Sequence, residues 1–177
     1  MTKILSTALL NLYALNEGVL DAVFVTKIEG LGSEVNTIYG LSGILGLGNE
    51  EIILTDTSIN VGLINSIDSK TSGVINANSI TTLTGTASDL NAAYASSGIS
   101  NLNEAAAKVS GTLSVAAANA FAAGFSGAVT ATISDGDMAS LAALSETGNA
   151  YTITITDASV AAADLNNLDT KTTVAID

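Results

Sequence analysis

The feature that most constrains this chain is a repeat. An extended apolar stretch runs into a Gly or Asp six times, and a short segment with helical spacing follows at once. The anchors lie 22 to 29 residues apart and are Gly30, Asp56, Gly85, Gly111, Asp135 and Asp157. A period of roughly 20–50 residues is typical of solenoids, in which each unit forms one coil and packs on the next.

The repeat extends beyond spacing to the residues themselves. Residues 26–44, TKIEGLGSEVNTIYGLSGI, match residues 81–99, TTLTGTASDLNAAYASSGI, without gaps at an offset of 55. Residues 55–71, TDTSINVGLINSIDSKT, match residues 156–172, TDASVAAADLNNLDTKT, at an offset of 101. Two kinds of coil, a Gly type and an Asp type, therefore alternate in the first half of the chain.

Each repeat has an extended half and a helical half. The extended halves are rich in Thr, Val and Ile, and the helical halves carry apolar residues at i, i+3/4 and i+7/8. Parallel strands joined by short crossover helices wind right-handed. We therefore predict an α/β fold, a right-handed solenoid of about six strand-plus-short-helix coils with a parallel sheet. It covers residues 26–177, with coils starting near residues 26, 53, 81, 108, 131 and 154. The helix N-caps expected from the sequence are Ser33, Ser58, Ser88, Ser114, Asp137 and Ser159.

The first 25 residues have a different composition. Residues 4–25 form the one long apolar run, with polar residues near helical spacing. Asn11, Glu17 and Asp21 argue against a membrane span. A signal peptide fits less well than a helix, because the apolar region is interrupted and lacks a convincing small-residue cleavage site. We predict that residues 1–25 form an amphipathic helix that caps the first coil.

Composition excludes several classes of function. The net charge is −12, with five Lys and no Arg or His, so nucleic-acid binding and adsorption to an anionic membrane are disfavoured. The absence of Cys removes disulfides, thiol nucleophiles and zinc-thiolate sites together. The remaining acids, bases and nucleophiles carry no catalytic motif. We therefore expect no enzyme activity and no catalytic residues.

The best candidate pair of carboxylates is in Asp135-Gly136-Asp137, at a predicted strand-to-helix turn. As a glycosidase dyad it is weak, because residues this close in a turn rarely flank a substrate bond from two sides. The favoured interpretation is a turn with a helix N-cap. The alternative is a calcium site, since Asp-x-Asp supplies hard oxygen ligands. Asp135 and Asp137 are thus the metal-ligand candidates, and calcium is the one cofactor considered.

Other residues recur at equivalent places in the repeats. Asp68/Lys70 and Asp169/Lys171 suggest surface ion pairs at helix ends. A set of asparagines in the helical halves is placed to bridge neighbouring coils, namely Asn36, Asn65, Asn91, Asn119 and Asn166.

Segments such as TLTGTASDLNAAYASSGI, GLGNEEIILTDTSI and ITDASVAAADLNNLDTKT resemble tandem repeats of very large, acidic secreted or surface proteins of marine cyanobacteria. They are also similar to stretches in fibre-like proteins of cyanophages. The resemblance covers about residues 26–177 and includes no catalytic motif. It implies extracellular display or structure, and it transfers no functional residue.

These observations predict a non-catalytic structural or adhesive repeat protein outside the cell or on its surface. Residues 173–177 look like the start of another coil, which predicts end-to-end association with further copies or membership of a longer array. The expected partners are copies of the same repeats and a glycan or other cell-surface ligand. The alternatives are a virion fibre or decoration protein and, less favoured, a β-solenoid enzyme acting on polysaccharide.

Overall fold

The computed structural model describes residues 2–17, 19–102 and 105–177. The chain divides into two compact units. The first comprises Met1–Leu83 and Asp89–Leu102, and the second Thr84–Ser88 and Asn103–Asp177. The described residues contain parallel sheets and seven helices, so the predicted α/β class is confirmed.

A five-stranded parallel sheet organises the first unit. Its strands, in order across the sheet, are β1 (Thr2–Leu5), β3 (Val25–Gly30), β5 (Glu51–Leu54), β7 (Ile75–Asn76) and β9 (Ile99–Ser100). A smaller parallel pair is formed by β2 (Leu20–Asp21) and β4 (Ile44–Leu45). The strands β6 (Ser58–Asn60) and β8 (Thr82–Gly85) follow β5 and β7 along the chain.

One isoleucine in each strand occupies the same register in this sheet. The paired positions, from β1 to β9, are Ile4, Ile28, Ile52, Ile75 and Ile99. The three central isoleucines are fully buried. Burying a side chain of this size contributes about 1.5–3 kcal/mol. The repeat in the sequence therefore places the same apolar residue at the same depth of the core in successive strands.

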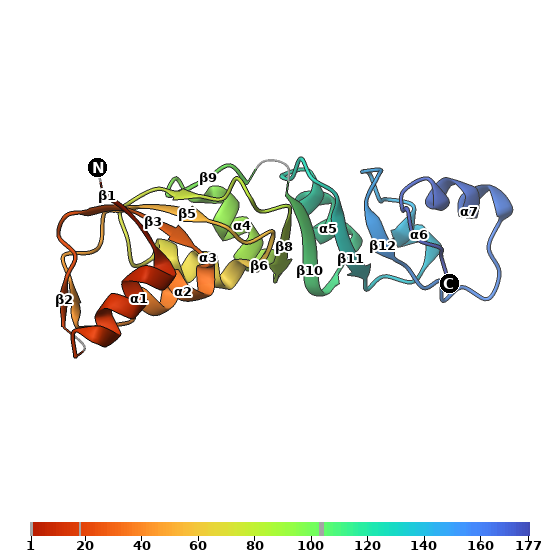
Figure 1. Cartoon of the computed structure of the whole chain (residues 1–177). Helices are drawn as coiled ribbons and strands as arrows, with labels where there is room; N and C mark the ends of the chain where they lie inside the picture. Colours follow the sequence, from red (N-terminus) through yellow and green to blue (C-terminus); the bar gives the residue numbers. More distant parts are fainter. Residues whose placement is uncertain (1, 18, 103–104) are drawn as a thin grey trace. The chain divides into compact units, whose positions relative to one another are not determined.

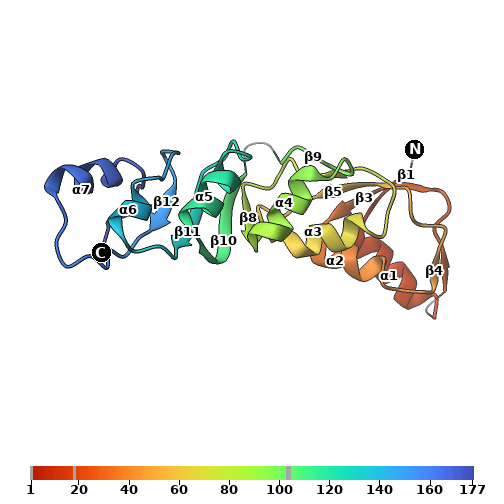
Figure 2. The same ribbon diagram turned by 180° about the vertical axis from the view of Figure 1, so that it is seen from behind.

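Short helices pack beside this sheet (Figure 1). They are α1 (Ser6–Leu15), α2 (Gly32–Ile38), α3 (Val61–Asp68) and α4 (Ala87–Ala95). Both views place α1, α2 and α3 next to one another (Figure 2). In α3 the buried residues are Val61, Ile64 and Ile67, spaced by three as the helical period requires.

The second unit repeats this design with fewer elements. Three parallel strands, β10 (Ala106–Leu113), β11 (Val129–Ile133) and β12 (Ala150–Thr152), lie side by side in chain order. The helices are α5 (Val115–Ala122), α6 (Met138–Leu141) and α7 (Ala162–Asp169). Beyond α7 the chain returns to β12, with a parallel bridge between Asn149 and Thr172. In β11 the residues alternate between buried and exposed, so its apolar face points into the core.

The N-terminal segment differs from the long helix expected over residues 1–25. Thr2–Leu5 form a strand because they find a hydrogen-bonding partner in β3. The helix is limited to Ser6–Leu15, and the chain leaves it at Glu17, whose φ of 54° is left-handed and ends a helix. Residues 1 and 18 lie outside the described part of the chain. The segment thus pairs with the next coil as the later strands pair with theirs.

The helix caps also differ in part from the prediction. Ser114 caps α5 and Asp137 caps α6, as expected. The prediction is wrong for Ser58, which lies in β6, because Asn60 caps α3. It is also wrong for Ser33 and Ser88, which lie inside α2 and α4, and for Ser159. Leu31 and Ala161 occupy the N-cap positions of α2 and α7 without a side-chain bond. Other residues, described below, supply the missing acceptor for α2.

Candidate functional site

The Asp135-Gly136-Asp137 turn joins β11 to α6. The Asp137 Oδ1 atom accepts a hydrogen bond from the Ser140 backbone N–H at 2.9 Å. That bond, with a second from the Ser140 side chain, holds the pKa of Asp137 below its usual value. Asp135 faces another helix, and its Oδ2 atom accepts from the Val115 N–H at 2.6 Å. The two carboxylates therefore serve two helices, and the N-cap interpretation of Asp137 is confirmed.

The calcium alternative at this turn stays a prediction. Each aspartate already has one oxygen bonded to a helix N–H. Within residues 2–17, 19–102 and 105–177, no group of three or more His, Cys, Asp or Glu side chains could hold a metal ion.

Asp135 belongs to a set of aspartates that cap the helix of the preceding coil. The Asp56 Oδ2 atom accepts from the Gly32 N–H at 2.8 Å, at the start of α2. Asp157 does the same for the Met138 N–H, at 2.7 Å, at the start of α6. In all three cases the acceptor follows the next strand, 19 to 24 residues later in the chain. These residues are the Asp anchors of the repeat, so the anchor has a physical role in joining successive coils.

Asparagines make a second set of links between coils. The Asn36 Oδ1 atom accepts from Ser66 Oγ at 3.0 Å and from Lys70 Nζ at 2.7 Å. Asn65 donates to the Asp89 carbonyl at 2.9 Å. In the second unit, the Asn119 amide donates to the Ala143 carbonyl and accepts from the Ser145 N–H. The predicted bridging is confirmed for these three asparagines, whereas the exposed Asn91 and Asn166 make no such bond to the described residues.

The ion pairs predicted at the helix ends are not formed within the described residues. Lys70 donates to Asn36, and Asp68 accepts from Ser96 Oγ at 2.7 Å. Lys171 donates to the Ser145 carbonyl at 3.3 Å. These side chains reach neighbouring coils because a partner there is closer than the residue two positions along the chain.

The repeat in the sequence does not predict the buried carboxylate of Glu50 in the first unit. Glu50 is fully buried, and it accepts from the Tyr39 hydroxyl at 2.6 Å and from the Gly48 N–H at 2.8 Å. Burial, followed by this bond, raises the pKa of Tyr39 far above its usual value. At the position equivalent to Glu50 in the later repeat stands Ala105, and there the Tyr94 hydroxyl donates to the Leu102 carbonyl at 2.9 Å. The matching tyrosines are therefore half-buried residues with different partners.

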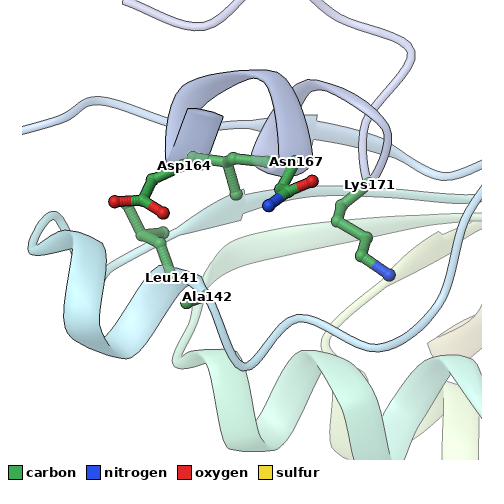
Figure 3. Close-up of a pocket in the computed structure, with 6 residues that line it drawn as sticks. Leu141, Ala142, Asp164, Asn167 and Lys171 are labelled. Atoms are coloured by element: carbon green, nitrogen blue, oxygen red, sulfur yellow. The ribbon is translucent and has the colours of Figure 1, made fainter. Parts of the chain in front are cut away.

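Two grooves flank α6 in the second unit. One has a volume of about 110 Å³ and lies between α6 and α7, where Asp164, Asn167 and Lys171 stand opposite Leu141 and Ala142 (Figure 3). The other, of about 430 Å³, lies between α5 and α6 and includes Asp135. The helix α6 has four residues, whereas α5 and α7 have eight each, so α6 leaves space on both of its sides.

A third cleft in the second unit has polar walls. Its volume is about 280 Å³, and it lies between the turn around residues 125–128 and the turn around residues 146–149. Glu146, Thr147 and Asn149 line one side, and Phe125 and Ser126 line the other. No motif in the sequence marks these residues, because the cleft arises where two turns that are distant in the sequence meet.

No known protein family, curated protein or solved structure matches the chain. Among the described residues, none of the helices is long and apolar enough to cross a membrane.

Proposed function

We propose that this chain is a non-catalytic structural or adhesive repeat protein that acts outside the cell or on its surface. In this proposal the two units are parts of one right-handed solenoid of about six coils, which associates end to end with further copies into a layer or filament. The observation that carries the proposal is the recurrence of the same links between successive coils. Aspartate caps and asparagine bridges occur in both units.

This pattern favours a scaffold because the side chains that recur in the repeats bond to neighbouring repeats. In the described residues, the anchor aspartates bind helix N–H groups, and three of the asparagines bind neighbouring coils. Each coil then contacts mainly its neighbours, which is the physical basis of an extended repeat protein. The net charge of −12 favours solubility at high concentration.

Support for self-association comes from exposed apolar residues near α1. Leu15 is 80% exposed, Val19 is 65% exposed and Phe24 is 83% exposed. Strand β1, at the edge of the five-stranded sheet, pairs only with β3 among the described strands. Exposed apolar clusters and free sheet edges are common at protein–protein contacts. We propose that a second copy covers this surface.

Light scattering over a wide concentration range tests the proposal. We expect the mean mass to grow steadily with concentration, as an end-to-end contact requires. Leu15→Ser with Phe24→Ser should lower the mass, because both side chains are exposed in the single chain and their removal costs no core packing. Leu165→Ser, at a residue 40% exposed in α7, is the matched control. A strictly monomeric particle at every concentration contradicts self-association, and a trimer that grows no further favours the virion fibre.

A further inference from the structure

The five-stranded sheet of the first unit follows one hydrogen-bonding pattern. In a parallel sheet, the backbone N–H and C=O of one residue bond to one side, and those of the next residue point to the other side. The Ile52 N–H donates to the Val74 carbonyl beside β7 at 2.9 Å, and the Ile75 N–H donates to the Gly98 carbonyl beside β9 at 2.8 Å. These two isoleucines therefore bond to the strand that follows theirs in the chain.

The same pattern holds at the start of the sheet. The Gly30 carbonyl accepts from the Thr55 N–H at 3.1 Å, so Ile28, two residues before Gly30, also faces β5. Ile4 lies opposite Ile28. Because the backbone groups of Ile28 point away from β1, those of Ile4 supply the bonds between β1 and β3. The residues on either side of Ile4 then point their backbone groups to the outer edge of β1, where no described strand pairs.

A matching edge lies in the second unit. Continued at the offset of 101 residues, the repeat places Ile176 at the position of Ile75. Asp177 donates to the Ile153 carbonyl at 3.1 Å and accepts from the Ile155 N–H at 2.7 Å. Since Asp177 bonds to the preceding strand, the N–H of Ile176 points the other way, and it bonds to no described residue. Ile176 thus has the geometry of Ile75 without a following strand.

We propose that the Ile176 edge of one copy pairs in parallel with the β1 edge of a second copy. In this contact Ile4 of the second copy lies opposite Ile176, as the isoleucines of β7 and β9 lie opposite each other. The Ile176 N–H donates to the Lys3 carbonyl of the second copy, and the Ile176 carbonyl accepts from its Leu5 N–H. The inference rests on the self-association in the proposed function and names the two surfaces that meet.

The charges at the two edges are complementary. Lys3 forms an ion pair with Glu29, which lies diagonally across from it on β3, and the Lys3 side chain is still 52% exposed. With Ile4 opposite Ile176, the exposed Asp177 takes the equivalent diagonal position on the other side of Lys3. The chain has five Lys against 17 acidic residues, so few registers can form such a pair. The pair therefore favours this register over a shifted one.

The contact joins two different edges, so it is heterologous. Each copy that binds leaves one edge of each kind for a further copy, and the assembly grows into a filament or closes into a ring. The side chains of Ile4 and Ile176 are half-buried in the single chain, and a paired strand covers them further. Burial of this apolar surface supplies the main driving force.

Two proline substitutions test the contact. Ile176→Pro removes the N–H of one edge and leaves the bonds of Asp177 in place. Leu5→Pro removes the N–H of the other edge, and the φ of −78° at Leu5 suits proline. In light scattering, each full-length variant alone should stay monomeric at concentrations at which the unchanged chain grows. An equimolar mixture should give a dimer and nothing larger, because each variant keeps the edge that the other lacks.

A second set of variants leaves the backbone unchanged. Ile176→Val keeps the N–H and should associate like the unchanged chain. Asp177→Lys faces Lys3 of the second copy with a like charge and should weaken association about fivefold. Asp169→Lys, at another exposed aspartate, alters the net charge equally and should not weaken association. If a proline variant unfolds at a lower temperature than the unchanged chain, the comparison of these two lysine variants decides.

The inference is overturned if a folded proline variant grows like the unchanged chain, if the mixture of proline variants stays monomeric, or if Asp177→Lys and Asp169→Lys associate equally. Growth that persists in all of these variants removes this contact alone and leaves the end-to-end association of the proposed function. An unchanged chain that stays monomeric at every concentration contradicts both.

Discussion

At the scale of single residues, the anchor aspartates link each helix to the coil that follows it. Asp56, Asp135 and Asp157 each accept from the first N–H of the preceding helix. A helix N-terminus has unpaired N–H groups and a partial positive charge. A carboxylate there accepts a hydrogen bond from these groups and also interacts favourably with the charge. The repeat in the sequence identifies these aspartates by their regular spacing. Which helix each aspartate caps can be known only from the folded structure.

Asp56→Ala should measure this link. It leaves the Gly32 N–H at the start of α2 without its acceptor, and α2 has no side-chain cap of its own. We expect a loss of about 0.5–2 kcal/mol in the free energy of unfolding, measured by urea titration. Asp169→Ala is the control, since that exposed carboxylate caps nothing in the described chain and should change stability by less than about 0.5 kcal/mol. Equal losses in the two variants would contradict the role of the anchor.

Tyr39 makes stability sensitive to alkaline pH. Its pKa in the folded chain lies above the value of about 10 in an unfolded chain, because the Tyr39 side chain is half-buried and its hydroxyl donates to Glu50. Above about pH 10 the unfolded state loses this proton first. The free energy of unfolding is therefore constant with respect to this group below pH 10 and falls as the pH rises further.

Tyr39→Phe should reduce that alkaline fall, as measured by urea unfolding at a series of pH values. At neutral pH the variant should lose about 1.5–3 kcal/mol, because the buried Glu50 carboxylate loses a donor. Tyr13→Phe, on the partly exposed side of α1, is the control. An unchanged slope above pH 10 in Tyr39→Phe would contradict the assignment.

At the scale of elements, the Gly30 anchor allows α1 and β3 to approach closely. A Cβ atom on Gly30 would clash with Oγ of Ser6, a buried residue at the start of α1 that donates to Glu34. Gly30→Ala should therefore destabilise the first unit by about 1–3 kcal/mol, measured by thermal and urea unfolding. Gly124→Ala offers a comparison, because its nearest atom is at an ordinary 3.5 Å. A neutral Gly30→Ala would show that α1 and β3 can move apart.

Most strands could be predicted from local patterns, but not the first. The strands at 25–30, 51–54 and 129–133 follow β-branched runs and agree with the sequence. The sequence pattern predicts a helix for residues 2–5, because Ile4 and Leu5 fit the helical spacing of the apolar residues that follow them. Their conformation is decided by pairing with β3, a contact more than 20 residues away that no local pattern contains.

In the candidate site, too, some features follow from the local sequence and others depend on contacts between distant residues. Asp137 was predictable as a cap because an N-cap acts within its own helix. Glu50 could not be found from the sequence, since it falls where the matching repeat has Ala105.

At the scale of the whole molecule, the net charge opposes the association that we propose. Two copies of a chain with a net charge of −12 repel each other. At 0.1 M ionic strength, salt largely screens this repulsion between charges that are more than about 10 Å apart. Self-association measured by light scattering should therefore strengthen as sodium chloride rises. Association that weakens with salt would contradict an apolar contact and indicate attraction between charged groups.

The aspartate caps also have a direction, with a consequence for how the protein is made. A helix completed on the ribosome waits for an acceptor that is translated 19 to 24 residues later. The most recently translated helix of a nascent chain therefore lacks its aspartate cap. Stable folding of each repeat should lag behind its synthesis by the length of about one repeat. Arrest of translation just before and just after Asp56, with limited proteolysis of the stalled chains, would make that delay visible.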